Sequence, residues 1–126
     1  MTEEENQKEQ QNQKRVPARF YQSDNGAEPV RDWLKDLDKE DRKLIGADIK
    51  TVEFGWPIGM PTCRSMGDGL FEVRTNLTNG RIARVLFCFF EGEMILLHGF
   101  IKKTRKTPNK ELAIALKRKR NLEAQG

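Results

Sequence analysis

Residues 70–102, LFEVRTNLTNGRIARVLFCFFEGEMILLHGFIK, decide the fold of this chain. Two turn sequences, Thr78-Asn79-Gly80 and Glu91-Gly92, divide them into three apolar segments. Asn-Gly tolerates the positive φ angles of a type I′ turn, so it is typical of a tight hairpin. We therefore expect three strands that two tight hairpins join into an antiparallel meander. The expected strands cover residues 70–77, 81–90 and 93–102.

The residues before the meander are expected to cover one side of this sheet. The second and third strands are almost continuously apolar, so much of both faces should be buried. Residues 28–37 place apolar side chains at i, i+3, i+4 and i+7, which predicts a short amphipathic helix. A second apolar stripe predicts a helix with Asp38 as its N-cap and its end near Gly55. Together the two helices would form a helical hairpin.

The remaining segments complete an α+β domain. Residues 16–21 are interpreted as a first strand, and residues 55–69 as irregular with a brief extended piece at 63–65. Thr107 is the expected N-cap of a final helix whose first residue is Pro108. The order β-α-α-β-β-β-α predicts an antiparallel sheet of three to four strands packed against the helical hairpin, with a C-terminal helix.

The chain has 126 residues and a mass of 14.6 kDa, which predicts a single domain. We place this domain at residues 15–122. Residues 1–14 contain Glu, Gln, Asn and Lys and no apolar residue after Met1. Such a composition cannot bury enough surface to offset the entropy of ordering, so we interpret the segment as a disordered acidic tail.

Several classes of protein are excluded by composition. The longest apolar run is far too short for a membrane span, and the first residues lack the apolar region of a signal peptide. Cys63 and Cys88, with a single histidine, do not supply the four ligands of a zinc site. We therefore expect no metal, no cofactor, no membrane partner, free thiols and a cytoplasmic location.

The net charge of +4 conceals an asymmetry along the chain. Residues 1–13 have a net charge of −3, residues 14–61 are neutral, and residues 62–120 have a net charge of +8. A concentrated basic excess favours a polyanionic partner such as nucleic acid. The alternative is a basic surface that only keeps the protein soluble.

Arg84 is the first candidate for chemistry, because it interrupts an apolar strand and is costly to bury unless it is paired or contacts a ligand. Glu72 and Arg74 share one face of the preceding strand. We expect these residues to converge with four cations beyond the last strand on one open patch. The four cations are Lys102, Lys103, Arg105 and Lys106.

Guanidinium and ammonium groups suit a phosphodiester, because they bind its oxygens and stabilise the extra charge of the transition state. If the anion is RNA, its own 2′-hydroxyl can attack the phosphate, and no metal is needed. A structural ion pair with Glu72 or Glu91 explains Arg84 equally well. His98 has a side chain that can carry protons near neutral pH, although a hydrogen-bonded core or rim residue is the stronger interpretation of its apolar surroundings.

Three segments resemble the RelE/HigB-type toxins of bacterial toxin–antitoxin modules, in particular their phage-related HigB-like branch. The segments are VRDWL (30–34), GLFEVR (69–74) and ARVLFCFFEGEMILLHGFIKKTRKTP (83–108). The similarity covers residues 16–120. It implies a RelE-like fold and a ribosome-dependent mRNA endoribonuclease that leaves a cyclic phosphate through 2′-hydroxyl attack. It also implies a small antitoxin partner, usually a HigA-like helix-turn-helix protein.

The resemblance assigns roles to individual residues. Arg84 matches the phosphate-stabilising arginine of the central strand, Arg74 a basic position on the preceding strand, and Lys103 a basic position that assists the leaving group. Lys102, Lys103 and His98 are the candidate proton carriers, because an arginine at 74 cannot act as a base. The expected contacts to RNA or the ribosome are Lys102, Arg105, Lys106, Lys117, Arg118, Lys119 and Arg120.

The chain also departs from RelE, with Glu72 in place of a second lysine and no tyrosine near the final helix. The same fold includes ParE-type toxins, which inhibit DNA gyrase and cleave nothing. Gyrase inhibition, or RNA binding without catalysis, is therefore the alternative function.

Overall fold

The computed structural model describes residues 14–59 and 61–126. Of the expected tail, only Lys14 lies within the described residues, and its Nζ is 3.0 Å from Oε2 of the buried Glu53. The boundaries of the expected domain, residues 15–122, stay a prediction, and the last helix continues beyond them to Gln125.

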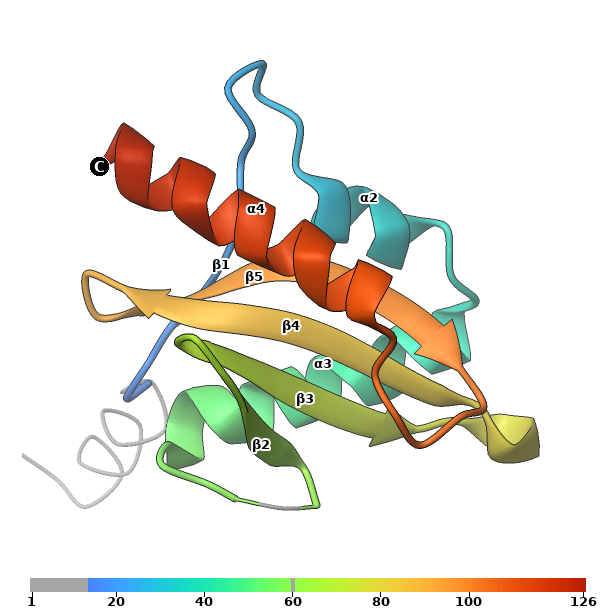
Figure 1. The fold of residues 1–126 in the computed structure, drawn as a ribbon. Helices are drawn as coiled ribbons and strands as arrows, with labels where there is room; N and C mark the ends of the chain where they lie inside the picture. Colours follow the sequence, from blue (N-terminus) through green and yellow to red (C-terminus); the bar gives the residue numbers. More distant parts are fainter. Residues whose placement is uncertain (1–13, 60) are drawn as a thin grey trace, which may run out of the picture.

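Within the described residues the chain forms five strands and three α-helices (Figure 1). The strands are β1 (Ala18–Phe20), β2 (Cys63–Gly67), β3 (Leu70–Asn76), β4 (Ile82–Phe90) and β5 (Glu93–Lys102). The helices are α2 (Pro29–Lys35), α3 (Lys39–Gly55) and α4 (Asn109–Gln125). The α+β class, the N-terminal helical hairpin and the C-terminal helix are confirmed.

The sheet has the strand order β1-β5-β4-β3-β2. The meander of β3, β4 and β5 is antiparallel, as the sequence predicts. The expectation of an antiparallel sheet of three to four strands is wrong, because the sheet is mixed and has five. Residues 63–67 pair with β3 as an edge strand, and β1 pairs in parallel with β5 at the opposite edge, with Ala18 beside Met94.

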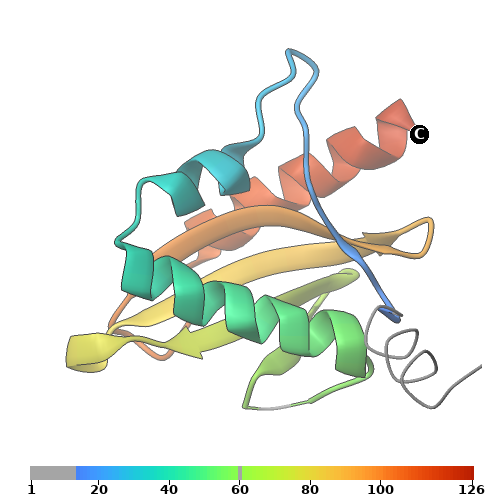
Figure 2. The ribbon, with the colours of Figure 1, turned by 180° about the vertical axis from the view of Figure 1, so that it is seen from behind.

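The helices cover opposite faces of the sheet. In Figure 1 α4 lies in front of the sheet and α3 behind it, and Figure 2 shows the reverse side, where α2 and α3 are in front. Alternate residues of β4 and β5 therefore enter two separate cores. Phe87 and Met94 pack with Ile45 of α3, whereas Leu86 and Ile95 pack in the second core beneath α4. Burial on both faces explains why these strands are almost continuously apolar.

A bulge in β5 changes the register at His98. Leu86 is opposite His98, but the next residue, Phe87, is opposite Leu96, so Leu97 is the extra residue. Leu97 belongs to the core beneath α4, and His98 contacts side chains of α4. Bulges of this kind direct consecutive side chains to one face, and here the bulge places His98 under α4.

The two hairpins of the meander differ. Glu91 and Gly92 both have positive φ angles, 51° and 80°, and they form the expected two-residue turn. The first hairpin is not the tight turn that Asn79-Gly80 predicts. Residues 77–81 form a longer loop that includes a short 3₁₀ turn, η1 (Thr78–Gly80), although Asn79 and Gly80 do adopt positive φ.

Neither expected N-cap forms a capping hydrogen bond. Asp38 precedes α3, but its side chain does not cap the helix, and Pro108 occupies the N-cap position of α4. Thr107 instead directs its hydroxyl to Glu72 of β3. Among the described residues, no helix has both the length and the apolar content that a bilayer span requires.

Candidate nucleic-acid interface

A buried carboxylate, Glu72, lies at the centre of the predicted site. β3 places Glu72 and Arg74 on the face beneath α4, and Arg84 reaches the same face because it is directly opposite Arg74 in the register of β3 and β4. Oε1 of Glu72 is 3.7 Å from Nε of Arg74 and 3.9 Å from Nε of Arg84. Its other oxygen, Oε2, accepts a hydrogen bond from the hydroxyl of Thr107. We call Glu72, Arg74, Arg84 and Thr107 the Glu72 cluster.

The expectation that Arg84 lies on an open patch is wrong, because its side chain is 0% exposed. Its Nη2 donates to the carbonyl oxygen of Thr104, and its guanidinium carbon is 5.9 Å from the centre of the Phe100 ring. Burial lowers the pKa of Arg84, and the nearby Glu72 opposes this shift. The geometry therefore matches the alternative in which Arg84 forms a structural ion pair with Glu72.

The Glu72 cluster contains polar atoms that are buried but not fully bonded. In the part of the chain that the structure describes, Nε and Nη1 of Arg84 and Oε1 of Glu72 have no hydrogen-bond partner. Arg74 and Arg64, which is opposite Glu72 on β2, both lower the pKa of Arg84 further. Two guanidinium groups thus lie within 4 Å of one carboxylate, and the charges of Glu72, Arg74 and Arg84 sum to +1.

Arg74 connects this cluster to the surface. Its side chain is 20% exposed, and its Nη2 donates to the carbonyl oxygen of Arg105 at 3.4 Å. A cavity of about 440 Å³ that also touches Arg74 lies between α3 and β3, on the opposite side of the sheet from the basic groups of the cluster. Arg74 is therefore the arginine of the cluster that an external phosphate can reach.

The loop between β5 and α4, residues 103–108, presents the predicted cations, and we call it the basic loop. Lys103, Arg105 and Lys106 are exposed, and Lys102 at the end of β5 is half-buried. The basic loop contacts the Glu72 cluster through the Thr104 and Arg105 carbonyl groups and through Thr107. The structure therefore places the backbone of the basic loop beside Arg74, while the convergence of the cationic side chains on one patch stays a prediction.

His98 lies apart from the basic loop, in a network beneath α4. Its Nδ1 is 3.3 Å from Nη1 of Arg118, and its Nε2 is 3.3 Å from Oε2 of Glu111. Arginine only donates, so Nδ1 accepts and the proton of the neutral ring lies on Nε2. Burial lowers the pKa of His98, and Glu111 opposes the shift. Both ring nitrogens are thus occupied, which matches the hydrogen-bonded rim residue.

The four consecutive cations of α4 do not form one surface. Lys117 and Arg120 are exposed, whereas Arg118 donates to the carbonyl oxygen of Leu97 at 2.8 Å and is half-buried. Lys119 pairs with Glu123, with its Nζ 3.1 Å from Oε1. Because consecutive residues of a helix point in different directions, only part of this run can contact a single partner.

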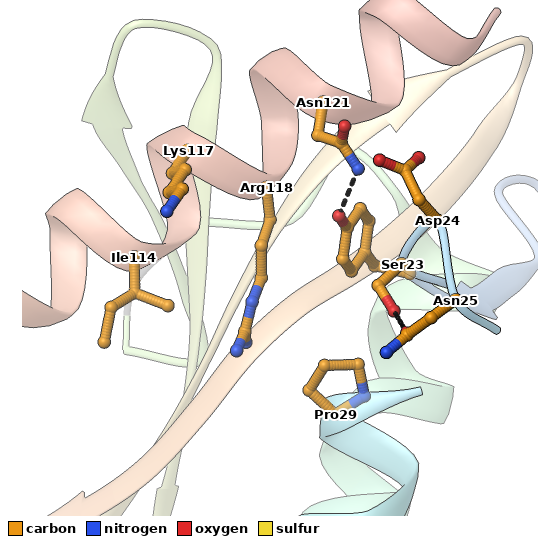
Figure 3. A pocket seen from close by; sticks show the side chains of 9 residues that line it. Ser23, Asp24, Asn25, Pro29, Ile114, Lys117, Arg118 and Asn121 are labelled. Carbon is orange, nitrogen blue, oxygen red and sulfur yellow. Dashed lines mark hydrogen bonds between the residues drawn. The ribbon is translucent and has the colours of Figure 1, made fainter. Parts of the chain in front are cut away.

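A groove of about 690 Å³ lies between the middle of α4 and the loop between β1 and α2 (Figure 3). Ile114, Lys117, Arg118 and Asn121 line it from α4. Asn121 closes one end by donating to the Tyr21 hydroxyl at 2.6 Å. The groove and the basic loop are thus at different places along α4.

Residues 32–120 match the model of one protein family, described as phage derived protein Gp49-like (DUF891). The chain belongs to this family. The Gp49-like family is RelE-like and is associated with the toxins of toxin–antitoxin systems. The comparison with curated proteins gave no match.

In this Gp49-like chain, sequence reasoning missed Thr107 and Arg64 and gave Glu72 only a secondary role. Thr107 followed by Pro108 is a typical start of a helix, so the sequence predicts that Thr107 caps the helix and gives no sign of its bond to Glu72. The alternation of β2 could have placed Arg64 on the face of Glu72, had residues 63–67 been recognised as a strand. Cys63 and Cys88, by contrast, are free and buried as expected, and burial raises the pKa of each thiol to about 11.

Proposed function

We propose that this Gp49-like chain is the toxin of a type II toxin–antitoxin system and cleaves mRNA on the ribosome. The observation that carries the proposal is the array of exposed cations on the basic loop next to Arg74. Membership of a toxin-associated family supports it. The proposed location is the cytoplasm, where ribosomes are found, and the proposed neutralising partner is a HigA-like helix-turn-helix antitoxin.

The proposed reaction needs only groups that RNA and this surface provide. The 2′-oxygen of the RNA forms a bond to the adjacent phosphorus, and the bond from phosphorus to the 5′-oxygen breaks, which leaves a 2′,3′-cyclic phosphate. Arg74 and the cations of the basic loop stabilise the added negative charge on the phosphate. Lys103, as the carrier of a proton to the departing 5′-oxygen, completes the step. Lys102 or Lys103 takes the 2′-hydroxyl proton.

Arg84 has a different role in this proposal from the one that sequence similarity implies. Its buried guanidinium holds Glu72 and the Thr104 carbonyl, so it supports the surface without contacting the substrate. His98 supports α4 in the same way. Lys117 and Arg120 extend the basic surface for contacts to ribosomal RNA.

Gyrase inhibition of the ParE type is the second candidate. It is favoured by one observation: within the described residues, the Glu72 cluster exposes no imidazole and no unpaired carboxylate that could serve as a general base. The same lack of an exposed general base also favours RNA binding without cleavage. Both alternatives predict intact mRNA.

Expression in cells separates these functions. Primer extension on mRNA from expressing cells should show new 5′ ends inside reading frames within minutes of induction. Growth arrest with intact mRNA and altered plasmid supercoiling would instead establish the gyrase-inhibiting function. Growth arrest with intact mRNA and normal supercoiling would leave RNA binding without cleavage as the function.

A further inference from the structure

Three hydrogen bonds fasten the basic loop to the Glu72 cluster. Arg84 donates to the Thr104 carbonyl oxygen, Arg74 donates to the Arg105 carbonyl oxygen, and the Thr107 hydroxyl donates to Glu72. They are spaced along residues 104–107, so they fix the path of the loop. The side chains of Lys103, Arg105 and Lys106 extend from this path into solvent.

The bond between Thr107 and Glu72 differs from the other two. Thr107 is 3% exposed and Glu72 is 1% exposed, whereas Thr104 and Arg105 are exposed. A hydrogen bond to a carboxylate is stronger away from water, and losing its donor leaves a buried acceptor unsatisfied. Oε1 of Glu72 already lacks a hydrogen-bond partner among the described residues, so Thr107 supplies the bond to Oε2 that the carboxylate depends on.

Thr107 also lies where the basic loop meets α4. Pro108 follows it and occupies the N-cap position, so the backbone direction at this junction is restricted. The hydrogen bond from Thr107 to β3 therefore fixes the position of the basic loop, which precedes residue 107, and of the start of α4, which follows it.

We propose that Thr107 is a positioning residue for the phosphate-binding surface. Its hydroxyl holds the Glu72 carboxylate, Glu72 holds the guanidinium of Arg74, and the loop presents its cations in one arrangement toward an RNA phosphate. The identity of the substrate rests on the proposed function, but the positioning is a property of the free protein. Ordering the surface before binding removes an entropic cost that a mobile loop would meet on binding RNA.

The test compares Thr107→Val, which keeps the shape and removes the hydroxyl, with Thr107→Ser, which restores it. Thr104→Val is the matched control, because Thr104 is in the same loop and its hydroxyl contacts only the Lys106 carbonyl oxygen among the described residues. Amide hydrogen exchange of residues 103–107 is measured in the free protein. The affinity for a short single-stranded RNA is measured in parallel.

In Thr107→Val we expect exchange in the basic loop to accelerate and RNA affinity to fall, each about tenfold, as for the loss of one buried bond to a charged group. Exchange in β4 should stay unchanged. Thr107→Ser and Thr104→Val should behave like the wild type. Unchanged loop exchange in Thr107→Val, no rescue by serine, or an equal effect of Thr104→Val would overturn the proposal.

A measurement on the wild type keeps the proposal testable if Thr107→Val does not fold. Despite its exposed cations, the basic loop should resist brief digestion with trypsin under native conditions, and rapid cleavage after Lys103, Arg105 or Lys106 would overturn the proposal. If the wild-type protein neither binds nor cleaves RNA, that result would contradict the proposed function and not the role of Thr107. The exchange comparison would still decide the role of Thr107.

Discussion

The Glu72 carboxylate lies between two guanidinium groups that face each other across β3 and β4. Like charges in directly opposed positions destabilise a sheet, and Glu72 offsets this repulsion. The arrangement makes each member of the Glu72 cluster depend on the others. The cluster is therefore a stability element as well as a candidate for function.

Replacing Arg84 should destabilise the protein because it leaves a buried carboxylate with less compensation. We expect Arg84→Met to lower the free energy of unfolding by about 3 kcal/mol, the lower end for a broken buried ion pair, since Arg74 remains 3.7 Å from Glu72. The double variant Glu72→Gln/Arg84→Met should recover at least half of this loss. Urea denaturation at pH 7 measures both, and a loss below about 1 kcal/mol in the single variant would contradict the ion pair.

His98 should make the stability depend on pH. Its pKa in the folded protein is below the ordinary value of 6.5, because burial disfavours the charged ring. Well above pH 6.5 the ring is neutral in both states. As the pH falls below 6.5, the unfolded chain binds the proton first, so the free energy of unfolding decreases until the folded-state pKa is reached.

His98→Gln isolates this contribution from the carboxylates that titrate in the same range. The decrease in unfolding free energy between pH 7 and pH 5 should be smaller in the variant than in the wild type. Urea denaturation across this range measures the difference, and an NMR titration of the His98 ring gives the pKa directly. Equal slopes in the two proteins would show that His98 is not shifted.

At the scale of the elements, the close approach of α2 to β5 depends on Gly99. A Cβ atom at Gly99 would lie 2.4 Å from two carbons of the Trp33 ring. Gly99→Ala should therefore cost about 1–3 kcal/mol of unfolding free energy through overpacking. Thermal or urea denaturation measures this loss, and Trp33→Leu in the same chain should restore part of it.

Gly46 provides the matched control for this prediction. It lies in α3, and a Cβ atom added there would meet no atom of another element within 4 Å, so Gly46→Ala should stabilise the protein by roughly 0.5–1 kcal/mol through helix propensity. Equal effects of the two alanine substitutions would show that α2 does not pack against Gly99 as described.

The sequence predicts the elements whose signals are local. The meander follows from its apolar segments and turns, and the helical hairpin follows from the helical spacing of its apolar residues. The pairing of β2 with β3 and of β1 with β5 depends on contacts that no short segment specifies, so the sequence predicts only a brief extended piece at residues 63–65 where β2 forms. Thr107 is a single-residue example: its hydroxyl bonds Glu72, 35 positions earlier in the chain, and the local sequence predicts only a helix cap.

The site was predicted in part for the same reason. Exposed cations in one loop are visible in the sequence, and in the structure Arg74 contacts the backbone of that loop at Arg105. Whether Arg84 points to solvent or into the protein depends on where the basic loop and α4 pack. Its burial could therefore not be read from the strand that contains it.

At the scale of the whole molecule, the two faces of the sheet have different roles. The helical hairpin covers one face, and the other bears α4, the Glu72 cluster and the basic loop (Figures 1 and 2). The basic loop exposes Lys103, Arg105 and Lys106 to solvent. An open basic surface of this kind suits an RNA strand that a larger partner, the ribosome, holds in place.

The central claim is that the basic loop cleaves ribosome-bound mRNA, and cleavage by purified protein on programmed ribosomes tests it most directly. The loop variant is Lys103→Gln/Arg105→Gln/Lys106→Gln, and the matched control is Lys39→Gln/Lys43→Gln/Lys50→Gln, which removes three exposed lysines of α3. All six side chains are exposed, so both variants should fold.

The wild type and the α3 control should cut the mRNA at the same positions and only when ribosomes are present. The loop variant should cut at least about a hundredfold more slowly, because preorganised charges at a transition state contribute that much or more. Intact mRNA with the wild-type protein, or a loop variant that cuts as fast as the wild type, would contradict the account.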